Sequence, residues 1–210
     1  MPPNEEPRPP LSIQQREFRR LMEQIRHAHE AFKTSWVEVR TAALKIRSLT
    51  PKTASWERIW EANGIAYAAA QPLADRRDRL LKELFEEHLV PLHERLLNGD
   101  PDAVNAVIDF LEVDVSAFRC GFAKQDYLRR LKSVPLSAEH LERLSQYGLR
   151  LCGIPTHRRE IGQAGRLMIR VANRDFVDHL EALTTSENRR VREKSAKMLT
   201  VVRNGREDLR

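Results

Sequence analysis

Basic side chains that could bind phosphate or carboxylate groups are concentrated near the end of the sequence. Residues 186–202, SENRRVREKSAKMLTVV, contain five Lys or Arg side chains within the nine positions 189–197. Residues 150–210 hold 14 basic and 8 acidic residues, whereas residues 1–100 hold 16 and 15. The net charge of +6 therefore belongs to the last third of the chain, and such asymmetry favours an acidic partner.

The residues that we expect to contact this partner come from the last helical hairpins. They are Arg158, Arg159, Arg166, Arg170, Arg189, Arg190 and Lys194. The favoured function is non-catalytic: a protein-binding or scaffolding module whose partner is another protein with an acidic surface. Sequence-independent binding of nucleic acid through the same residues is the alternative, because Lys and Arg neutralise backbone phosphates without reading bases.

The basic residues of 186–202 do not form a single stripe. At about 100° per residue, one face of the predicted helix carries its apolar and small residues, Val191, Ser195, Met198, Leu199 and Val202. The Lys and Arg residues spread around the rest of the helix and are interrupted by glutamates. The pattern predicts a helix packed along one seam, and a binding surface only where neighbouring hairpins add charge to the same side.

The two cysteines, Cys120 and Cys152, lie in apolar helical contexts. Cys120 could act as a nucleophile with His140 or His157 as its base, but a small core residue at a helix contact is the favoured interpretation. Buried free thiols are favoured over a disulfide for both cysteines. They predict a reducing compartment and a cytoplasmic protein.

Metal and nucleotide chemistry lack the residue patterns that they require. Glu23, His27 and Glu30 share a helix face, but the matching Glu and Glu-x-x-His sets of di-metal helical bundles are missing. Solvated surface charge is therefore favoured for these three residues. The sequence has no glycine-rich phosphate loop and neither a G-x-S-x-G nor an H-E-x-x-H motif. We expect no catalytic residues, no metal and no cofactor.

Helical periodicity runs through almost the whole sequence and predicts an all-α protein. The N-terminal helices are expected over 12–48, 55–70 and 72–98, the last with a kink or short break at Pro91. Shorter helices are expected over 101–113, 116–131, 137–152, 156–172, 173–183 and 186–204. No run of about 18 apolar residues occurs, so no membrane span is predicted.

The last predicted hairpin, residues 176–202, has a distinctive order of apolar and small residues. Leucines at positions 180 and 183 end its first helix, Val191-Arg192 begins the second, small residues stand at 195 and 196, and a leucine stands at 199. This order resembles a HEAT repeat, although Ser186 and Asn188 occupy the turn where that family has aspartates. The resemblance implies an α-solenoid of stacked hairpins.

Two earlier hairpins extend this resemblance. Phe118-Arg119 and Arg158-Arg159 stand where Val191-Arg192 stands, at intervals of 40 and 33 residues, which predicts about three repeats. Some HEAT-like proteins, including the alkylpurine DNA glycosylases, grip a duplex and carry tryptophans in a catalytic pocket. Residues 100–203 contain no tryptophan, so the glycosylase chemistry is not expected, whereas binding of the nucleic-acid backbone stays open.

The predicted organisation has four parts. They are a disordered Pro-rich tail over 1–11, an N-terminal helical region of about three helices over 12–98, HEAT-like repeats over 99–205 and a C-terminal tail over 206–210. The tryptophans Trp36, Trp56 and Trp60 all lie in the N-terminal region. For Trp56 and Trp60, which lie one helical turn apart, burial in a core is favoured over an exposed aromatic patch, and the role of all three tryptophans stays open.

Overall fold

The computed structural model describes residues 13–49, 56–114 and 120–209, and the regular structure in these ranges is helical. The prediction of an all-α protein is therefore confirmed. The elements are α1 (Ile13–Leu49), α2 (Trp56–Glu83), the π-helix η1 (Leu84–Leu89), α3 (Val90–Leu97), α4 (Pro101–Val113), α5 (Cys120–Arg130), α6 (Ala138–Gly153), α7 (Ile161–Val171), α8 (Arg174–Thr184), α9 (Arg189–Gly205) and the 3-10 helix η2 (Glu207–Leu209).

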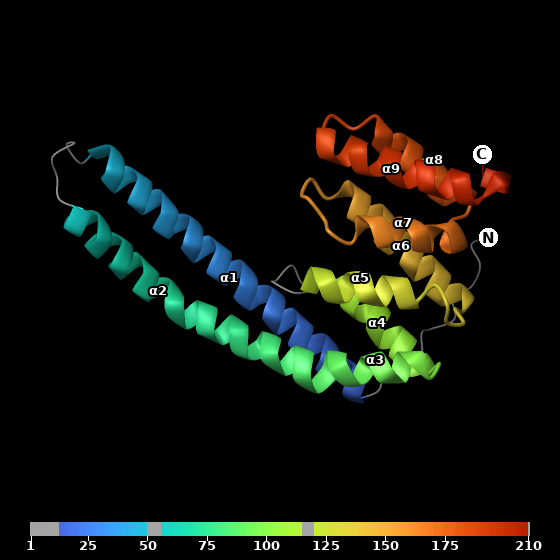
Figure 1. Ribbon diagram of the computed structural model, residues 1–210, viewed down its shortest axis with the longest axis horizontal. Helices are drawn as coiled ribbons and strands as arrows, with labels where there is room; N and C mark the ends of the chain where they lie inside the picture. Colours follow the sequence, from blue (N-terminus) through green and yellow to red (C-terminus); the bar gives the residue numbers. More distant parts are fainter. Residues whose placement is uncertain (1–12, 50–55, 115–119, 210) are drawn as a thin grey trace, which may run out of the picture.

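The shorter helices pack in two rows (Figure 1). One row contains α4, α6 and α8, the other contains α5, α7 and α9, and each helix contacts the next one in its row. The N-terminal region extends both rows, because α1 contacts α4 and α3 contacts α5. Consecutive hairpins therefore pack on one another, while the resemblance to the HEAT family stays a prediction.

Helices α1 and α2 form a long hairpin whose far end projects away from the two rows (Figure 1). The first half of α1 is buried through Phe18, Leu21, Met22 and Ile25, which belong to one core shared with the later helices. Further along α1, the Trp36 side chain is 42% exposed. The hairpin is thus anchored at one end, and an angle opens between α1 and the rows.

The expected boundary between helices over 55–70 and 72–98 is wrong, because α2 continues through Pro72. A proline within a helix removes one backbone hydrogen bond, here the bond to the carbonyl of Ala68. Ala68 is exposed, so water can replace the missing donor. Packing against α1 along its length then keeps α2 continuous.

The irregularity predicted at Pro91 takes the form of the π-helix η1. Within it, the Val90 N–H donates to the carbonyl of Phe85, five residues earlier. Proline lacks an N–H, and its ring crowds the preceding turn. A wider π turn immediately before Pro91 accommodates both effects, and the helix resumes as α3.

Helices α8 and α9 each begin with an asparagine that caps the first turn. The predicted cap of α8 is confirmed, because the Asn173 side chain accepts from the Phe176 N–H. The predicted cap of the last helix at Ser186 is wrong: Asn188 accepts from the N–H groups of Arg190 and Val191. The cap moves because the Asn188 side chain reaches two free N–H groups of the first turn.

Two further boundaries differ from expectation. Helix α7 begins at Ile161 instead of Thr156, since Arg158 in the intervening turn is held by an ion pair with Asp114. The predicted tail over 206–210 contains η2, and Leu209 is buried. The predicted tail over 1–11, the helix stop at Thr50-Pro51 and the helix start at Ser116 lie outside the described residues.

A buried carboxylate ties three helices together. Asp109 of α4 is 2% exposed, and its Oδ1 accepts from Nη2 of Arg143 in α6 at 2.5 Å and from Nη2 of Arg19 in α1. Arg143 also holds Glu112 with two hydrogen bonds of 2.9 and 2.7 Å. A buried carboxylate is stable only when such partners are present.

The N-terminus of α6 is capped by Ser137 and His140. The His140 Nδ1 accepts from the N–H of Ser137, while the His140 N–H donates to the Ser137 Oγ, which forms a capping box. Since Nδ1 is an acceptor, Nε2 carries the proton and donates to Oδ1 of Asn105 in α4 at 3.0 Å. Burial, with a smaller contribution from Arg143, lowers the pKa of His140.

We predict that Asp109→Asn destabilises the protein by about 3 kcal/mol, because it removes the buried negative charge that two guanidinium groups share. The matched control is Asp178→Asn, which breaks the exposed ion pair with Arg174 and is expected to cost less than about 1 kcal/mol. Urea unfolding followed by circular dichroism measures both. Equal losses in the two variants would show that Asp109 does not hold the helices together.

We predict that lowering the pH from 7.5 to 5.5 destabilises the wild type more than His140→Gln. The lowered pKa means that the unfolded chain takes up a proton first, so stability is lost as pH falls below about 6.5. A Gln retains the acceptor of a capping box and does not titrate. Thermal melts at both pH values measure this difference, and identical pH dependence in the two proteins contradicts the assignment.

Candidate functional site

Three of the seven predicted partner-binding residues make internal contacts. Arg158 donates through Nη2 to Oδ2 of Asp114 at 2.7 Å, and its side chain is only 13% exposed. Arg170 donates through Nη1 to the carbonyls of Leu131, Lys132 and Val134 after α5, at 3.2, 3.0 and 2.7 Å. These side chains hold neighbouring hairpins together, which is a structural use of their charge.

Lys194 is the third residue of this kind. Its Nζ donates to the carbonyl of Leu151 at 2.7 Å and to the carbonyl of Ile154, both at the end of α6. Carbonyls at the end of a helix lack partners within the helix, so a cation there satisfies and stabilises them. Burial lowers the pKa of this lysine.

The other four predicted residues present their charge to solvent. The guanidinium group of Arg159 lies 4.2 Å from the ring centroid of Phe122, which is 52% exposed. Arg189 pairs with Glu193 at 2.6 Å. Arg166 and Arg190 are exposed and have no carboxylate partner within the described part of the chain.

The turns that carry several of these residues lie at one end of the two rows. Figure 1 shows the α6–α7 and α8–α9 turns and the start of α5 at the end that faces the projecting hairpin. Arg159 and Phe122 belong to this end, as do Arg189 and Arg190 at the start of α9. We call these four residues the turn edge. Arg166 lies in the body of α7, away from the turns.

A pocket of about 610 Å³ lies in the angle between α1 and the rows. Its walls come from the middle of α1, the end of α4, and the end of α6 with the turn that follows it. The basic and imidazole side chains that line it are Arg26, His29, Lys33, Arg150, His157 and Arg158. Its volume falls within the range of about 300–1,000 Å³ that is typical of small-molecule sites.

The acidic side chains of this pocket already have cationic partners. Glu30 pairs with Lys33 at 3.0 Å, and Glu112 is held by Arg143 from behind the pocket. Among residues 13–49, 56–114 and 120–209, Arg26 and Arg150 pair with no carboxylate. The pocket therefore presents uncompensated positive charge.

Asp114 stands at the back of this pocket in an unusual conformation. It ends α4 with φ 54° and ψ 46°, a left-handed conformation that non-glycine residues rarely adopt. Its carboxylate is bound by Arg158 and by Nζ of Lys124 at 2.5 Å, a lysine that is 1% exposed. The buried carboxylate of Glu160 lies 3.9 Å from the same Nζ. This ion cluster fixes the α6–α7 turn against α4 and α5.

His29 lines the pocket with both ring nitrogens buried and without hydrogen-bond partners. Burial, followed by the nearby Lys33, lowers the pKa of this histidine. At neutral pH the ring is therefore neutral, with one donor and one acceptor unused. Buried polar atoms without partners are uncommon and indicate a site that water or a ligand completes.

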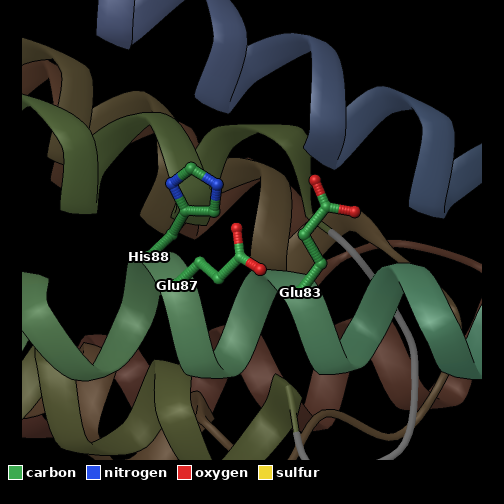
Figure 2. Close-up of side chains that lie close together, drawn as sticks. All are labelled: Glu83, Glu87 and His88. Atoms are coloured by element: carbon green, nitrogen blue, oxygen red, sulfur yellow. The ribbon is translucent and has the colours of Figure 1, made fainter.

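One cluster of possible metal ligands occurs among the described residues, at the junction of α2 and η1. The ligand atoms of Glu83, Glu87 and His88 lie within 4.8 Å of one another, and Figure 2 shows all three side chains on the same side of the helix. Both glutamates are exposed, and the His88 ring packs at 5.3 Å from the ring of Phe18. The cluster is explained as surface charge beside a core contact.

Several of the reactive side chains considered from the sequence have structural roles, whereas His157 is exposed and lines the pocket. Cys120 and Cys152 are buried thiols, as predicted. His140 closes a helix, and Glu30 pairs with a lysine. Trp36 stacks on Phe32 at 6.0 Å on the projecting hairpin. The side chains of Trp56 and Trp60 lie outside the described residues.

Most pocket residues were missed by the sequence interpretation. Arg26, His29 and Arg150 belong to unremarkable amphipathic segments and are separated from one another by up to 124 positions. No local pattern brings α1 against the end of α6. The one local signal for the pocket is Asp114, an acidic residue between an apolar predicted helix and the next predicted helix start. Its cationic partners, Lys124 and Arg158, come later in the sequence and are not indicated by any local pattern.

The chain matches no protein-family model, no curated protein and no solved structure. None of the helices in the described ranges is both long and apolar enough to cross a membrane. The functional proposals below therefore depend on the residues and contacts of this chain.

We predict that Arg170→Gln and Lys194→Gln each destabilise the protein by about 1.5–3 kcal/mol, because each leaves helix-end carbonyls without a charged donor. The controls Arg166→Gln and Arg190→Gln are expected to stay within about 0.5 kcal/mol of the wild type. Urea unfolding measures all four. If the four variants are equally stable, the division between internal and solvent-facing cations is wrong.

Proposed function

We propose that the protein is a non-catalytic binding module that recognises an acidic surface of another protein. The observation that carries this proposal is the exposed pair of Phe122 and Arg159 at the turn edge, with the guanidinium stacked on the ring. Aromatic and arginine side chains dominate the binding energy of protein interfaces. The Gln125 side chain donates to the Arg159 carbonyl at 2.7 Å, so the pair is held in position.

The position of Arg189 and Arg190 supports the same surface. Both lie in the first turn of α9, where the helix dipole disfavours cations. Their charge therefore does not serve the stability of their own helix, apart from the exposed pair between Arg189 and Glu193. An acidic partner would gain from both guanidinium groups and from the helix terminus.

A protein partner is favoured over nucleic acid by the same geometry. The apolar ring of Phe122 beside a guanidinium suits a mixed surface of carboxylates and apolar side chains. Phosphate-backbone binding relies on many cations, whereas Arg158, Arg170 and Lys194 are occupied by internal contacts. The proposal includes stacked HEAT-like hairpins and a cytoplasmic location, in keeping with two buried thiols.

We predict that neutralising the solvent-facing cations abolishes capture of a native protein partner. The test variant changes four residues to Gln: Arg159, Arg166, Arg189 and Arg190. The control variant makes the same change in net charge on the N-terminal hairpin, at the exposed residues Arg16, Arg20, Arg76 and Arg79. Affinity capture from cell extract followed by mass spectrometry compares the two variants with the wild type, with and without nuclease.

The proposal expects a partner that is retained by the control, lost by the test variant and unaffected by nuclease. Binding of a random-sequence duplex is measured in parallel by fluorescence anisotropy at about 50 and 150 mM salt. Tight duplex binding at the lower salt that falls steeply at the higher salt, together with nuclease-sensitive capture, would replace the protein partner by nucleic acid.

A further inference from the structure

We propose that the pocket between α1 and the end of α6 binds a small organic anion that carries phosphoryl groups. This site is distinct from the turn edge and does not depend on the proposed protein partner. It is lined by three separate parts of the fold, α1, the end of α4 and the end of α6 with the turn that follows it, and has a volume of about 610 Å³. Inorganic phosphate alone would leave most of this volume empty, whereas a phosphorylated metabolite or nucleotide fills it.

The charge of the pocket selects an anion. Arg26 of α1 and Arg150 of α6 both line the pocket, and neither is paired with a carboxylate in the part of the chain that the structure describes. Arg150 makes only a weak bond of 3.4 Å to the Leu111 carbonyl, and its guanidinium lies 5.7 Å from the Tyr147 ring centroid. Both guanidinium groups therefore keep donors for a ligand.

The acidic side chains of the wall do not cancel this charge. Glu30 and Asp114 are neutralised by Lys33 and by Arg158 with Lys124, and Glu112 is held by Arg143. The carboxylates therefore do not compete with a ligand for Arg26 and Arg150. The largely buried pair of Asp114 and Arg158 also holds one lining cation in position, which reduces the entropy lost on binding.

A phosphoryl group suits this arrangement better than a single carboxylate. Its oxygens project in three directions and can accept from the guanidinium groups of two different helices, whereas a carboxylate offers two oxygens in one plane. The remaining organic part of the ligand can contact the apolar side chains of Val113 and Ile154, which also line the pocket.

The test uses the full-length chain and isothermal titration calorimetry at 150 mM salt. The probes are pyrophosphate and ATP in magnesium-free buffer, with citrate as a carboxylate anion of similar charge. At least one phosphoryl probe is expected to bind with a Kd below about 1 mM and at least tenfold more tightly than citrate. In Arg26→Gln this binding weakens by about tenfold or more, since one charged hydrogen-bond donor is lost.

The matched control is Arg20→Gln, an equal change of charge on an exposed residue of the same helix outside the pocket. It is expected to leave the Kd within about twofold of the wild type. Arg26 is itself exposed and without a carboxylate partner among the described residues, so its variant is expected to fold normally. Nuclear magnetic resonance shifts of the Thr156 and His157 amides on titration give an independent location for the bound probe.

Three results would overturn the inference: no phosphoryl probe binds below about 1 mM, citrate binds as tightly, or Arg20→Gln weakens binding as much as Arg26→Gln. None of them bears on the protein partner, because neither arginine belongs to the turn edge. Conversely, if the variant of Arg159, Arg166, Arg189 and Arg190 still captures the partner, the protein-partner proposal fails and the pocket is unaffected, since none of these residues lines it. The two proposals therefore fail separately.

Discussion

The buried carboxylate of Asp109 is the interaction on which the arrangement of the protein depends. It joins α4 to α6 through Arg143 and to α1 through Arg19. A buried charge that loses its partner is strongly destabilising, so arrangements that separate Asp109 from either arginine are disfavoured. The carboxylate therefore specifies how the long N-terminal hairpin meets the rows, and hence the angle in which the pocket lies.

The same physical rule divides the cations of the chain into two groups. The edges of a helical array contain many helix C-termini, and each C-terminus exposes carbonyls without partners. Arg170 and Lys194 satisfy such carbonyls across hairpins, while Arg158 neutralises Asp114. Only the cations left over after these requirements, such as Arg190, are available to a partner. The net charge of the protein therefore overstates the number of cations that a partner could contact.

Features that depend only on residues close together in the sequence could be predicted from it. The helical class, the cap of α8 by Asn173 and the burial of both cysteines follow from local patterns. The continuity of α2 through Pro72 could not be predicted, because packing against α1 outweighs the local preference of proline. The pocket could not be predicted either, since Arg26 and Arg150 line the same pocket only because of how α1 packs on the later helices.

The α6–α7 turn connects the two candidate sites through adjacent residues. Arg158 points inward to Asp114 and the pocket, whereas Arg159 stacks outward on Phe122 at the turn edge. The turn is held on both sides, by the ion cluster of Asp114 and Lys124 and by the hydrogen bond from Gln125. A turn held on both sides keeps Arg158 at the pocket and Arg159 at the turn edge in fixed positions, so each site is organised before its ligand or partner binds.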